Sequence, residues 1–444
     1  MFHRQIKFHF GLSLVETLIS ITIFLLIILS VYSAFAGIIK LTSITKAKVS
    51  AWSLVNQKLE IIHNLAYKNV GTIGGIPNGT IPQNEDIVLN GINYHIQTTI
   101  VYYDDPADGI SVSDDGTDTL PTDYKKVKII VSWNGHFSGQ VSGETTIAPP
   151  GLETNAGGGT LRIKVFNASG DPVPQAQVRI DNNKIDPSIG ADYLTDNQGI
   201  VTLFGAPTST EGYEIKVTKD GYSADRTYTT DEVANPAKPP ASVMENQLTE
   251  ISFSIDQVSQ FNLNTKIVGE LGTSTFSNAS FTLNGSKTIG TDANNKPVLK
   301  FSEDYQSDEN GQRSIPNLEW DSYTFSTSSD SYLSISSTSP AQPIDLLPNT
   351  SKDATIYFQA QNSLLLTILN SSSSQPVFGA TAHFYLSDYS YDQTQLTNQD
   401  GETEFLPLEP KTYNLTVSMT GYQTSTLDVL INGHTKKTIY LSPE

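Results

Sequence analysis

The stretch HFGLSLVETLISITIFLLIIL, residues 9–29, decides how the chain begins. It is mainly apolar, Glu16 is its only carboxylate, and no further charged residue follows until Lys40. Because about 20 apolar residues cross the hydrocarbon core of a bilayer, residues 17–39 are expected to form a membrane-spanning helix. An ionisable group at membrane depth is costly, so Glu16 is a candidate functional residue.

The helix is expected to continue beyond this segment. Apolar residues recur in steps of three and four along an amphipathic stripe, which is widened by further apolar neighbours. The stripe comprises Trp52, Val55, Leu59, Ile62 and Ala66, with Leu54, Ile61 and Leu65 beside it. We therefore expect one helix over residues 12–68, whose second half packs on a globular head, and Gly71 is a plausible end signal.

Composition limits the remaining possibilities. The 444 residues exceed what one core usually holds, so two to four domains are expected. The net charge of −19 gives no basic surface for nucleic acid, and we expect no nucleic-acid partner. The chain has no cysteine, which excludes disulfides and thiol chemistry.

Residues 69–147 alternate like the strands of a small antiparallel sheet. Asn90-Gly91 separates two such runs and predicts a two-residue hairpin turn. Tyr124–Trp133 alternates well, and the following Asn134-Gly135 predicts a second tight turn. The sequence thus predicts a small antiparallel sheet over residues 85–147 that packs on the helix, which together form an α+β head.

The loop at 104–118, DDPADGISVSDDGTD, is densely acidic. Its six aspartates are Asp104, Asp105, Asp108, Asp114, Asp115 and Asp118. Carboxylate oxygens are the ligands that Ca²⁺ prefers, so calcium is a candidate cofactor here. The spacing is not that of an EF-hand loop, and a solvated acidic loop is the competing interpretation.

The rest of the chain repeats itself after a Pro- and Gly-rich linker at 148–159. Three repeats, 160–256, 257–360 and 361–444, each carry a polar turn ending in glycine and two later tyrosines nine residues apart. The glycines are Gly199, Gly311 and Gly401, and the tyrosine pairs are Tyr213 and Tyr222, Tyr323 and Tyr332, and Tyr413 and Tyr422. Repeats of this length predict tandem seven-stranded β-sandwiches. The glycines are expected at positive φ, and the tyrosines are expected to bury their rings while their hydroxyls bond a nearby turn.

Gly11-Leu12-Ser13-Leu14-Val15-Glu16, after a short basic leader, resembles the processing motif of type IV prepilins and type II secretion pseudopilins. The resemblance implies that a prepilin peptidase removes residues 1–11 by cutting between Gly11 and Leu12, and methylates the new amine of Leu12. It also implies that Glu16 pairs with such an amine and sets the register of packed helices. Leu12 stands where the family more often has Phe. The head resembles V-type minor pilins and I-type pseudopilins.

The repeats resemble the carboxypeptidase regulatory-like domain, a transthyretin-like sandwich that accompanies a peptidase without being catalytic. In the second repeat, Ser331 replaces the glycine that precedes the second tyrosine. The chain has no His-Glu-x-x-His, no Gly-x-Ser-x-Gly and no cysteine nucleophile, so we expect no enzymatic activity.

These observations favour a minor type IV pilin-like subunit in the cytoplasmic membrane and at the cell surface, with other pilins as partners and an unidentified surface, cell or secreted protein as ligand. One alternative is a pseudopilin of a type II secretion or DNA-uptake machine. Another is a secreted multi-domain protein whose signal peptide is cleaved after Ala34-Phe35-Ala36.

Overall fold

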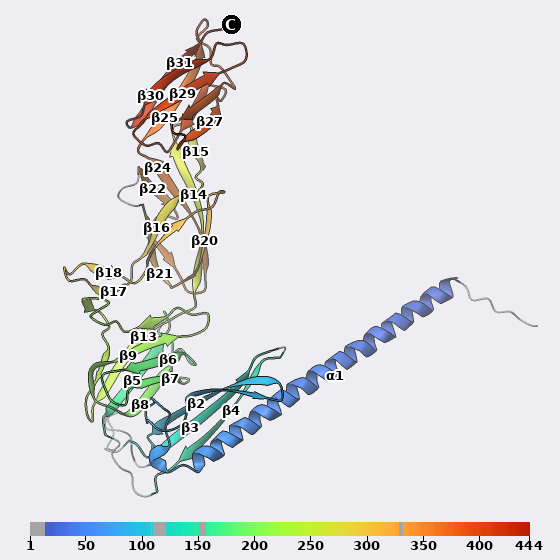
Figure 1. The fold of residues 1–444 in the computed structure, drawn as a ribbon, viewed down its shortest axis with the longest axis vertical. Helices are drawn as coiled ribbons and strands as arrows, with labels where there is room; N and C mark the ends of the chain where they lie inside the picture. The colour runs from blue at the N-terminus through green and yellow to red at the C-terminus, as the bar shows by residue number, and fades with distance from the viewer. Residues whose placement is uncertain (1–13, 108, 110–120, 136, 151–156, 328–331) are drawn as a thin grey trace, which may run out of the picture.

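The computed structural model describes residues 14–107, 109, 121–135, 137–150, 157–327 and 332–444. In this part of the chain one long helix and one short 3₁₀ turn are followed only by strands. Figure 1 shows the helix projecting from a small head, with three β-sandwiches following one another in a column. The expected fold class, an α+β head with tandem β-sandwiches, is confirmed.

Helix α1 (Leu14–His63) is continuous from the apolar segment into the head. At 1.5 Å per residue it is about 75 Å long. It ends at His63, earlier than the expected residue 68, and the 3₁₀ turn η1 (Tyr67–Asn69) follows.

The second half of α1 packs on the head along one stripe. The stripe is confirmed at Leu54, Val55 and Ile62, but the prediction was wrong for Trp52 and Ile61, which are 42% and 44% exposed. The stripe instead continues toward the N-terminus through small residues: Ala47, Ser50 and Ala51. Small side chains allow a helix to approach a sheet closely, while Trp52 and Ile61 lie on the outer side of the helix.

The head sheet has four antiparallel strands in the order β1-β2-β3-β4. They are β1 (Asn84–Leu89), β2 (Ile92–Tyr103), β3 (Tyr124–Trp133) and β4 (Gly139–Ile147). The hairpin at Asn90-Gly91 is confirmed, with φ of 53° and 78° at the two turn residues. The second turn was predicted wrongly: β3 and β4 are joined by residues 134–138, because β4 begins only at Gly139.

Each repeat forms two facing sheets. In the first, one sheet contains β5 (Gly159–Phe166), β8 (Ile200–Ala206) and β13 (Leu248–Ser254). The other contains β6 (Gln177–Asn182), β7 (Ile189–Leu194), β9 (Ser209–Thr218), β10 (Asp225–Arg226) and β12 (Ala241–Val243).

The second sandwich is built in the same way with additional short strands. One sheet contains β14 (Ser259–Gly269), β15 (Gly272–Thr275), β20 (Gln312–Leu318), β22 (Leu333–Ser339) and β24 (Ser351–Ala360). The other contains β16 (Ser280–Gly285), β19 (Ser302–Gln306), β21 (Asp321–Ser326) and β23 (Ile344–Leu346).

The third sandwich has the expected strand content, with a three-stranded and a four-stranded sheet. The first contains β25 (Ser363–Asn370), β28 (Glu402–Phe405) and β31 (His434–Leu441). The second contains β26 (Thr381–Tyr385), β27 (Asp392–Leu396), β29 (Thr412–Ser418) and β30 (Ser425–Leu430). The first two sandwiches have more than the seven strands expected. Their additional strands are short and were not predicted, because the repeated sequence motif does not include them.

The column arises from one pairing that recurs in all three sandwiches. The first strand of each repeat pairs in parallel with its last strand: β5 with β13, β14 with β24, and β25 with β31. Since parallel strands start at the same end, the chain enters each sandwich at one end and leaves at the other. The next sandwich is therefore placed beyond the previous one rather than beside it.

The joint between the head and the first sandwich is closely packed. Ile76 of the head is buried in the core of the sandwich, and its amide donates to the Tyr193 hydroxyl at 2.9 Å. The Gln83 side chain exchanges two hydrogen bonds with the backbone of Asp192, at 2.8 and 2.9 Å. The head and the first sandwich therefore share a core, which favours movement as one body.

The two later joints include hydrogen bonds between consecutive sandwiches. Between the first and second sandwiches, β11 (Asn235–Pro236) pairs with β17 (Thr288–Thr291), which also pairs with β18 (Pro297–Leu299). Between the second and third, the buried Glu404 carboxylate accepts hydrogen bonds from the amides of Glu270 and Leu271, both at 3.1 Å. Backbone groups of one sandwich are thus satisfied by the next.

Candidate functional site

The N-terminal half of α1 is apolar around its whole circumference. Every side chain from residue 14 to residue 43 is exposed, including eighteen large apolar side chains from Leu14 to Leu41. A helix that is hydrophobic all round is normally buried, in a membrane or against other helices. By length and composition alone α1 is able to cross a membrane, a test that a signal sequence also passes.

Six hydroxyl groups of this segment are satisfied within the helix itself. Thr17, Ser20, Thr22, Ser30, Ser33 and Thr42 each donate to a backbone carbonyl three or four residues earlier, at 2.7 or 2.8 Å. Such bonds let Ser and Thr enter an apolar environment without an unpaired donor. The segment is therefore suited to lipid or to a tightly packed helix bundle.

Glu16 lies in the first turn of α1 and is exposed. A carboxylate at that position also interacts favourably with the helix dipole, which is a purely structural reason for an acidic residue there. Gly11 and Leu12, the expected cleavage residues, lie outside the described residues. The position of Glu16 thus agrees with either role.

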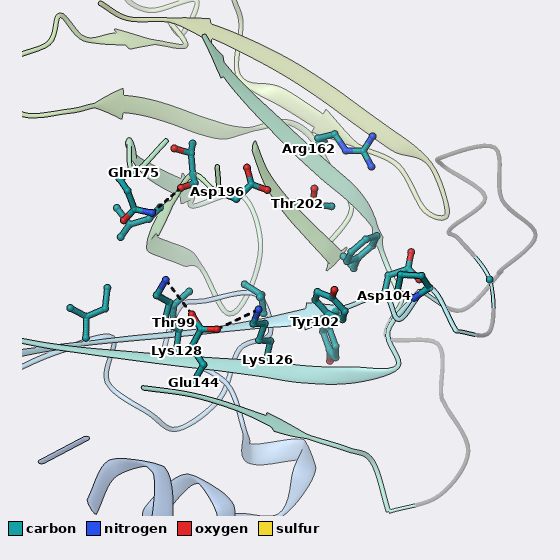
Figure 2. A pocket seen from close by; sticks show the side chains of 18 residues that line it. Thr99, Tyr102, Asp104, Lys126, Lys128, Glu144, Arg162, Gln175, Asp196 and Thr202 are labelled. Atoms are coloured by element: carbon teal, nitrogen blue, oxygen red, sulfur yellow. Dashed lines mark hydrogen bonds and ion pairs between the residues drawn. The ribbon is translucent and has the colours of Figure 1, made fainter. Parts of the chain in front are cut away.

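A cleft of about 570 Å³ separates the head sheet from the first sandwich. Figure 2 shows Lys126, Lys128 and Glu144 on the head side of this cleft and Arg162 on the sandwich side. Glu144 pairs with both lysines, at 3.5 and 3.3 Å, and Arg162 lies 4.0 Å from Glu250. Although partial burial acts in the opposite direction, the hydrogen bond from Lys128 and the charges of the lysines hold the pKa of Glu144 below its usual range. The cations of this cleft are balanced by carboxylates.

The acidic loop begins at the edge of this cleft. Asp104 lines the cleft, and the Asp105 amide donates to the carboxylate of Asp123. The remaining aspartates of the proposed calcium loop, Asp108, Asp114, Asp115 and Asp118, lie outside the described residues. Among the residues that are described, no three His, Asp or Glu side chains are grouped to hold a metal ion, so calcium binding stays a prediction.

The three repeated turns have one geometry. Gly199, Gly311 and Gly401 have φ of 71°, 70° and 72°. In each turn the carbonyl of the glycine accepts a hydrogen bond from the first strand of its sandwich, from Val165, Thr265 or Ile368, at 2.7 or 2.8 Å. Three residues before the glycine, the side chain of Asp196, Asp308 or Asn398 accepts hydrogen bonds from the backbone amides two and four residues after it. The turn therefore attaches to the sandwich through its backbone, which explains why the motif recurs.

The first tyrosine of each pair is a core residue. Tyr213, Tyr323 and Tyr413 are at most 1% exposed. Their hydroxyls donate to the carbonyls of Pro207, Glu319 and Glu409, at 2.5, 2.8 and 3.3 Å. The phenol group thus fills the core while its polar end bonds the chain just before it.

The second tyrosines are less uniform. Tyr222 and Tyr422 pack against the edges of their cores. Both follow a glycine at positive φ, Gly221 or Gly421. Tyr332 is 42% exposed, so the expectation of a buried ring was wrong there, in the repeat that lacks this glycine.

Lys125 is a buried lysine of the head that no sequence motif indicated. It is 2% exposed, and its ammonium donates to the carbonyls of Tyr67 and Val70 at 2.9 and 2.6 Å. The charge also lies 4.4 Å from the centre of the Tyr67 ring. Burial lowers the pKa of Lys125 to about 8. Alternation places Lys125 on the buried face of β3 with Val127 and Ile129, but a lysine is so rarely buried that the sequence did not single it out.

We predict that the head becomes more stable between pH 8 and pH 10 because of Lys125. In this range the folded head holds a neutral Lys125 while the unfolded chain, with an ordinary lysine pKa, remains protonated, so the unfolded state binds more protons and stability rises with pH. Relative to Lys125→Met, the wild type should gain about 1–2 kcal/mol, measured as the unfolding of the head in the full chain by calorimetry. Lys126→Met, at a 43% exposed side chain, is the control: it keeps Lys125, so its stability should rise with pH as in the wild type. If the stability of the wild type and of Lys125→Met changed equally with pH, Lys125 would not be the source of the gain.

Comparison with known proteins finds no matching family model and no matching curated protein. Among solved structures, the Bacillus anthracis TIE protein is 14% identical, with a TM-score of 0.22, over 81% of this chain and 73% of that one. A streptococcal ancillary pilin is 12% identical, with a TM-score of 0.20, over 65% of this chain and 99% of its own. BcpA, the major pilin subunit of Bacillus cereus, is 10% identical, with a TM-score of 0.18, over 65% and 100%. Similarities at this level assign neither a family nor a function to the chain.

Proposed function

We propose that the protein is a minor type IV pilin-like subunit. It is inserted in the cytoplasmic membrane through α1 and then assembled, through the same helix, into a pilus or pseudopilus. The three sandwiches are presented outside for adhesion or for binding a partner. The observation that carries this proposal is the fully exposed apolar segment, residues 14–43, which continues without a break into a helix packed on a folded head.

The continuity of α1 supports assembly in addition to anchoring. A simple membrane anchor needs only about 20 apolar residues and tolerates a flexible link to its domain. Here the same helix carries Ala51, Leu54 and Val55 into the core of the head, so the head is held at a fixed distance and orientation from the apolar segment. Fixed geometry is what a subunit needs in order to stack regularly with neighbours.

Glu16 supplies the specificity in this proposal. Apolar packing alone does not fix how far one helix slides along another, because each one-turn shift buries similar surface. A carboxylate in an apolar environment requires a cation. The amine of Leu12, created when residues 1–11 are removed by the prepilin peptidase, is the proposed cation, on the same subunit or on a neighbouring pilin.

The column of sandwiches indicates which position such a subunit occupies in the filament. A subunit in the shaft of a filament is surrounded by others, and three sandwiches in a column would have to project from every copy. We therefore propose a low-copy position near the filament tip. Immunogold labelling with antibodies against residues 160–444 tests this: gold at the tips supports it, and gold spread uniformly along the shaft refutes it.

A further inference from the structure

A cleft of about 550 Å³ lies between the second and third sandwiches. Tyr332 and Leu333 line it from the second sandwich, and Leu386, Ser390 and Tyr391 line it from the loop after β26. Its volume falls within the range of about 300–1,000 Å³ that is typical of small-molecule sites. The cleft is thus large enough for a ligand of the size of one or two sugar rings.

The aromatic groups of this cleft are held firmly. The ring of Tyr391 packs edge-on against Phe384, at 6.1 Å between ring centres, and against Tyr413, at 5.4 Å. Its hydroxyl has no hydrogen-bond partner within the described part of the chain, and burial raises its pKa, so it stays protonated and able to donate. Tyr332, on the opposite side, leaves 42% of its surface exposed.

The charges of the cleft cancel. Glu409 and Lys411 are its charged lining residues, and their side chains form an ion pair at 2.5 Å. Glu409 would repel an anionic ligand and Lys411 would repel a cationic one. Neither side chain is free to attract a charged ligand, because the two already form an ion pair. The lining therefore matches a ligand without net charge that offers hydroxyl groups and an apolar face.

The loop that supplies Ser390 and Tyr391 also presents Tyr389 to solvent. Tyr389 is 64% exposed and has φ of 56°, a conformation that is uncommon for an aromatic residue. Its ring stacks on Tyr385, 5.5 Å between centres and 8° between planes, and Tyr385 stacks on His383 at 4.4 Å and 17°. The His383 ring is in turn paired with Asp392 at 2.7 Å. An exposed ring held by this stack is ordered in advance, which reduces the entropy lost on binding.

We infer that this cleft, with the Tyr389 ring on the same loop, binds an uncharged oligosaccharide. The C–H face of a pyranose ring packs on a tyrosine ring. One sugar hydroxyl donates to the Ser390 oxygen, whose own proton goes to Asp388 at 2.8 Å, and another accepts from the Tyr391 hydroxyl. A lone exposed tyrosine would be unremarkable, but here Tyr332, Tyr391 and Tyr413 line a neutral cleft, and Tyr389 is fixed on the same loop. This inference rests on the proposed function and deepens it, because it names the class of ligand that the column of sandwiches would bind.

The test uses the purified full chain in lipid nanodiscs, because many detergents carry sugar headgroups. Cellohexaose, chitohexaose and mannohexaose are the neutral probes, and a heparin hexasaccharide is the anionic probe, each titrated by calorimetry. At least one neutral probe should bind, and Tyr332→Ala and Tyr389→Ala should each weaken it about tenfold, as expected for a lost ring contact. Tyr391→Phe should weaken it severalfold by removing one hydroxyl.

Tyr440→Ala is the matched control, because Tyr440 is 57% exposed on β31, outside the cleft. It should bind like the wild type. Binding of none of the neutral probes, tighter binding of heparin, or an equal loss in Tyr440→Ala would overturn the inference. A Glu16→Gln chain should still bind the sugar, so failure of assembly and failure of sugar binding are observed separately.

Discussion

Replacing Glu16 by Gln is expected to lower incorporation into filaments at least tenfold while leaving the chain in the membrane. In our proposal the carboxylate pairs with the amine of Leu12 in an apolar setting, where an unpaired amine is strongly unfavourable. Glutamine has nearly the same shape but no charge, so it leaves that amine without its partner. It also removes a cost of insertion of up to about 3 kcal/mol, so the membrane-bound fraction should stay equal or rise. The measurement is the ratio of subunit in sheared filaments to subunit in membranes.

Glu60→Gln is the matched control for this experiment. Glu60 lies on the same helix and is exposed, but it belongs to the half that packs on the head. Its replacement should leave the ratio unchanged. If Glu16→Gln is recruited as efficiently as Glu60→Gln, Glu16 is only a favourable residue of the first helical turn and the electrostatic part of the proposal is wrong.

Gly401→Ala is expected to destabilise the third sandwich by about 2–4 kcal/mol. The residue has φ of 72°, and a Cβ atom there would lie 2.5 Å from the carbonyl oxygen of Ile368 on β25. Neither the turn nor the strand moves freely, because the Gly401 carbonyl accepts the Ile368 amide at 2.7 Å. Faster hydrogen exchange along β25 in the full chain, followed by mass spectrometry, measures the effect.

Gly379→Ala separates the two causes of this destabilisation. Gly379 has φ of 74°, but a Cβ atom there would meet nothing within 4 Å. It should therefore show only the backbone penalty, about 1–2 kcal/mol. Equal exchange rates in the two variants would show that the contact with Ile368 is unimportant and that the repeated turn does not attach to the first strand as described.

The features that could be predicted from the sequence are those set by neighbouring residues. Asn90-Gly91 specifies its hairpin because both residues readily adopt positive φ. The turns at Gly199, Gly311 and Gly401 were found in the same way. The sequence predicted that one side of the helix packs on the head, but it placed this side slightly wrongly. Large apolar residues such as Trp52 were expected in the core, whereas Ala47 and Ala51 are buried there.

The joints and the neutral cleft could not be predicted, because they depend on residues far apart in the chain. Ile76 enters a core whose other members begin at Leu161, and Glu404 bonds amides more than a hundred residues earlier. Tyr332 and Tyr391 face one cleft only because β22 and the loop after β26 belong to consecutive sandwiches. The spacing of residues in a single sequence does not reveal contacts between residues of different domains.

The central claim is that the apolar helix becomes an assembly element after a defined cleavage. The mature N-terminus, determined by mass spectrometry on protein from membranes and from filaments, tests it most directly. The account predicts a chain that begins at Leu12 with a methylated amine. A chain that begins at Gly37, as a secretory signal peptidase would leave it, would contradict the account, because α1 would then have lost its apolar half.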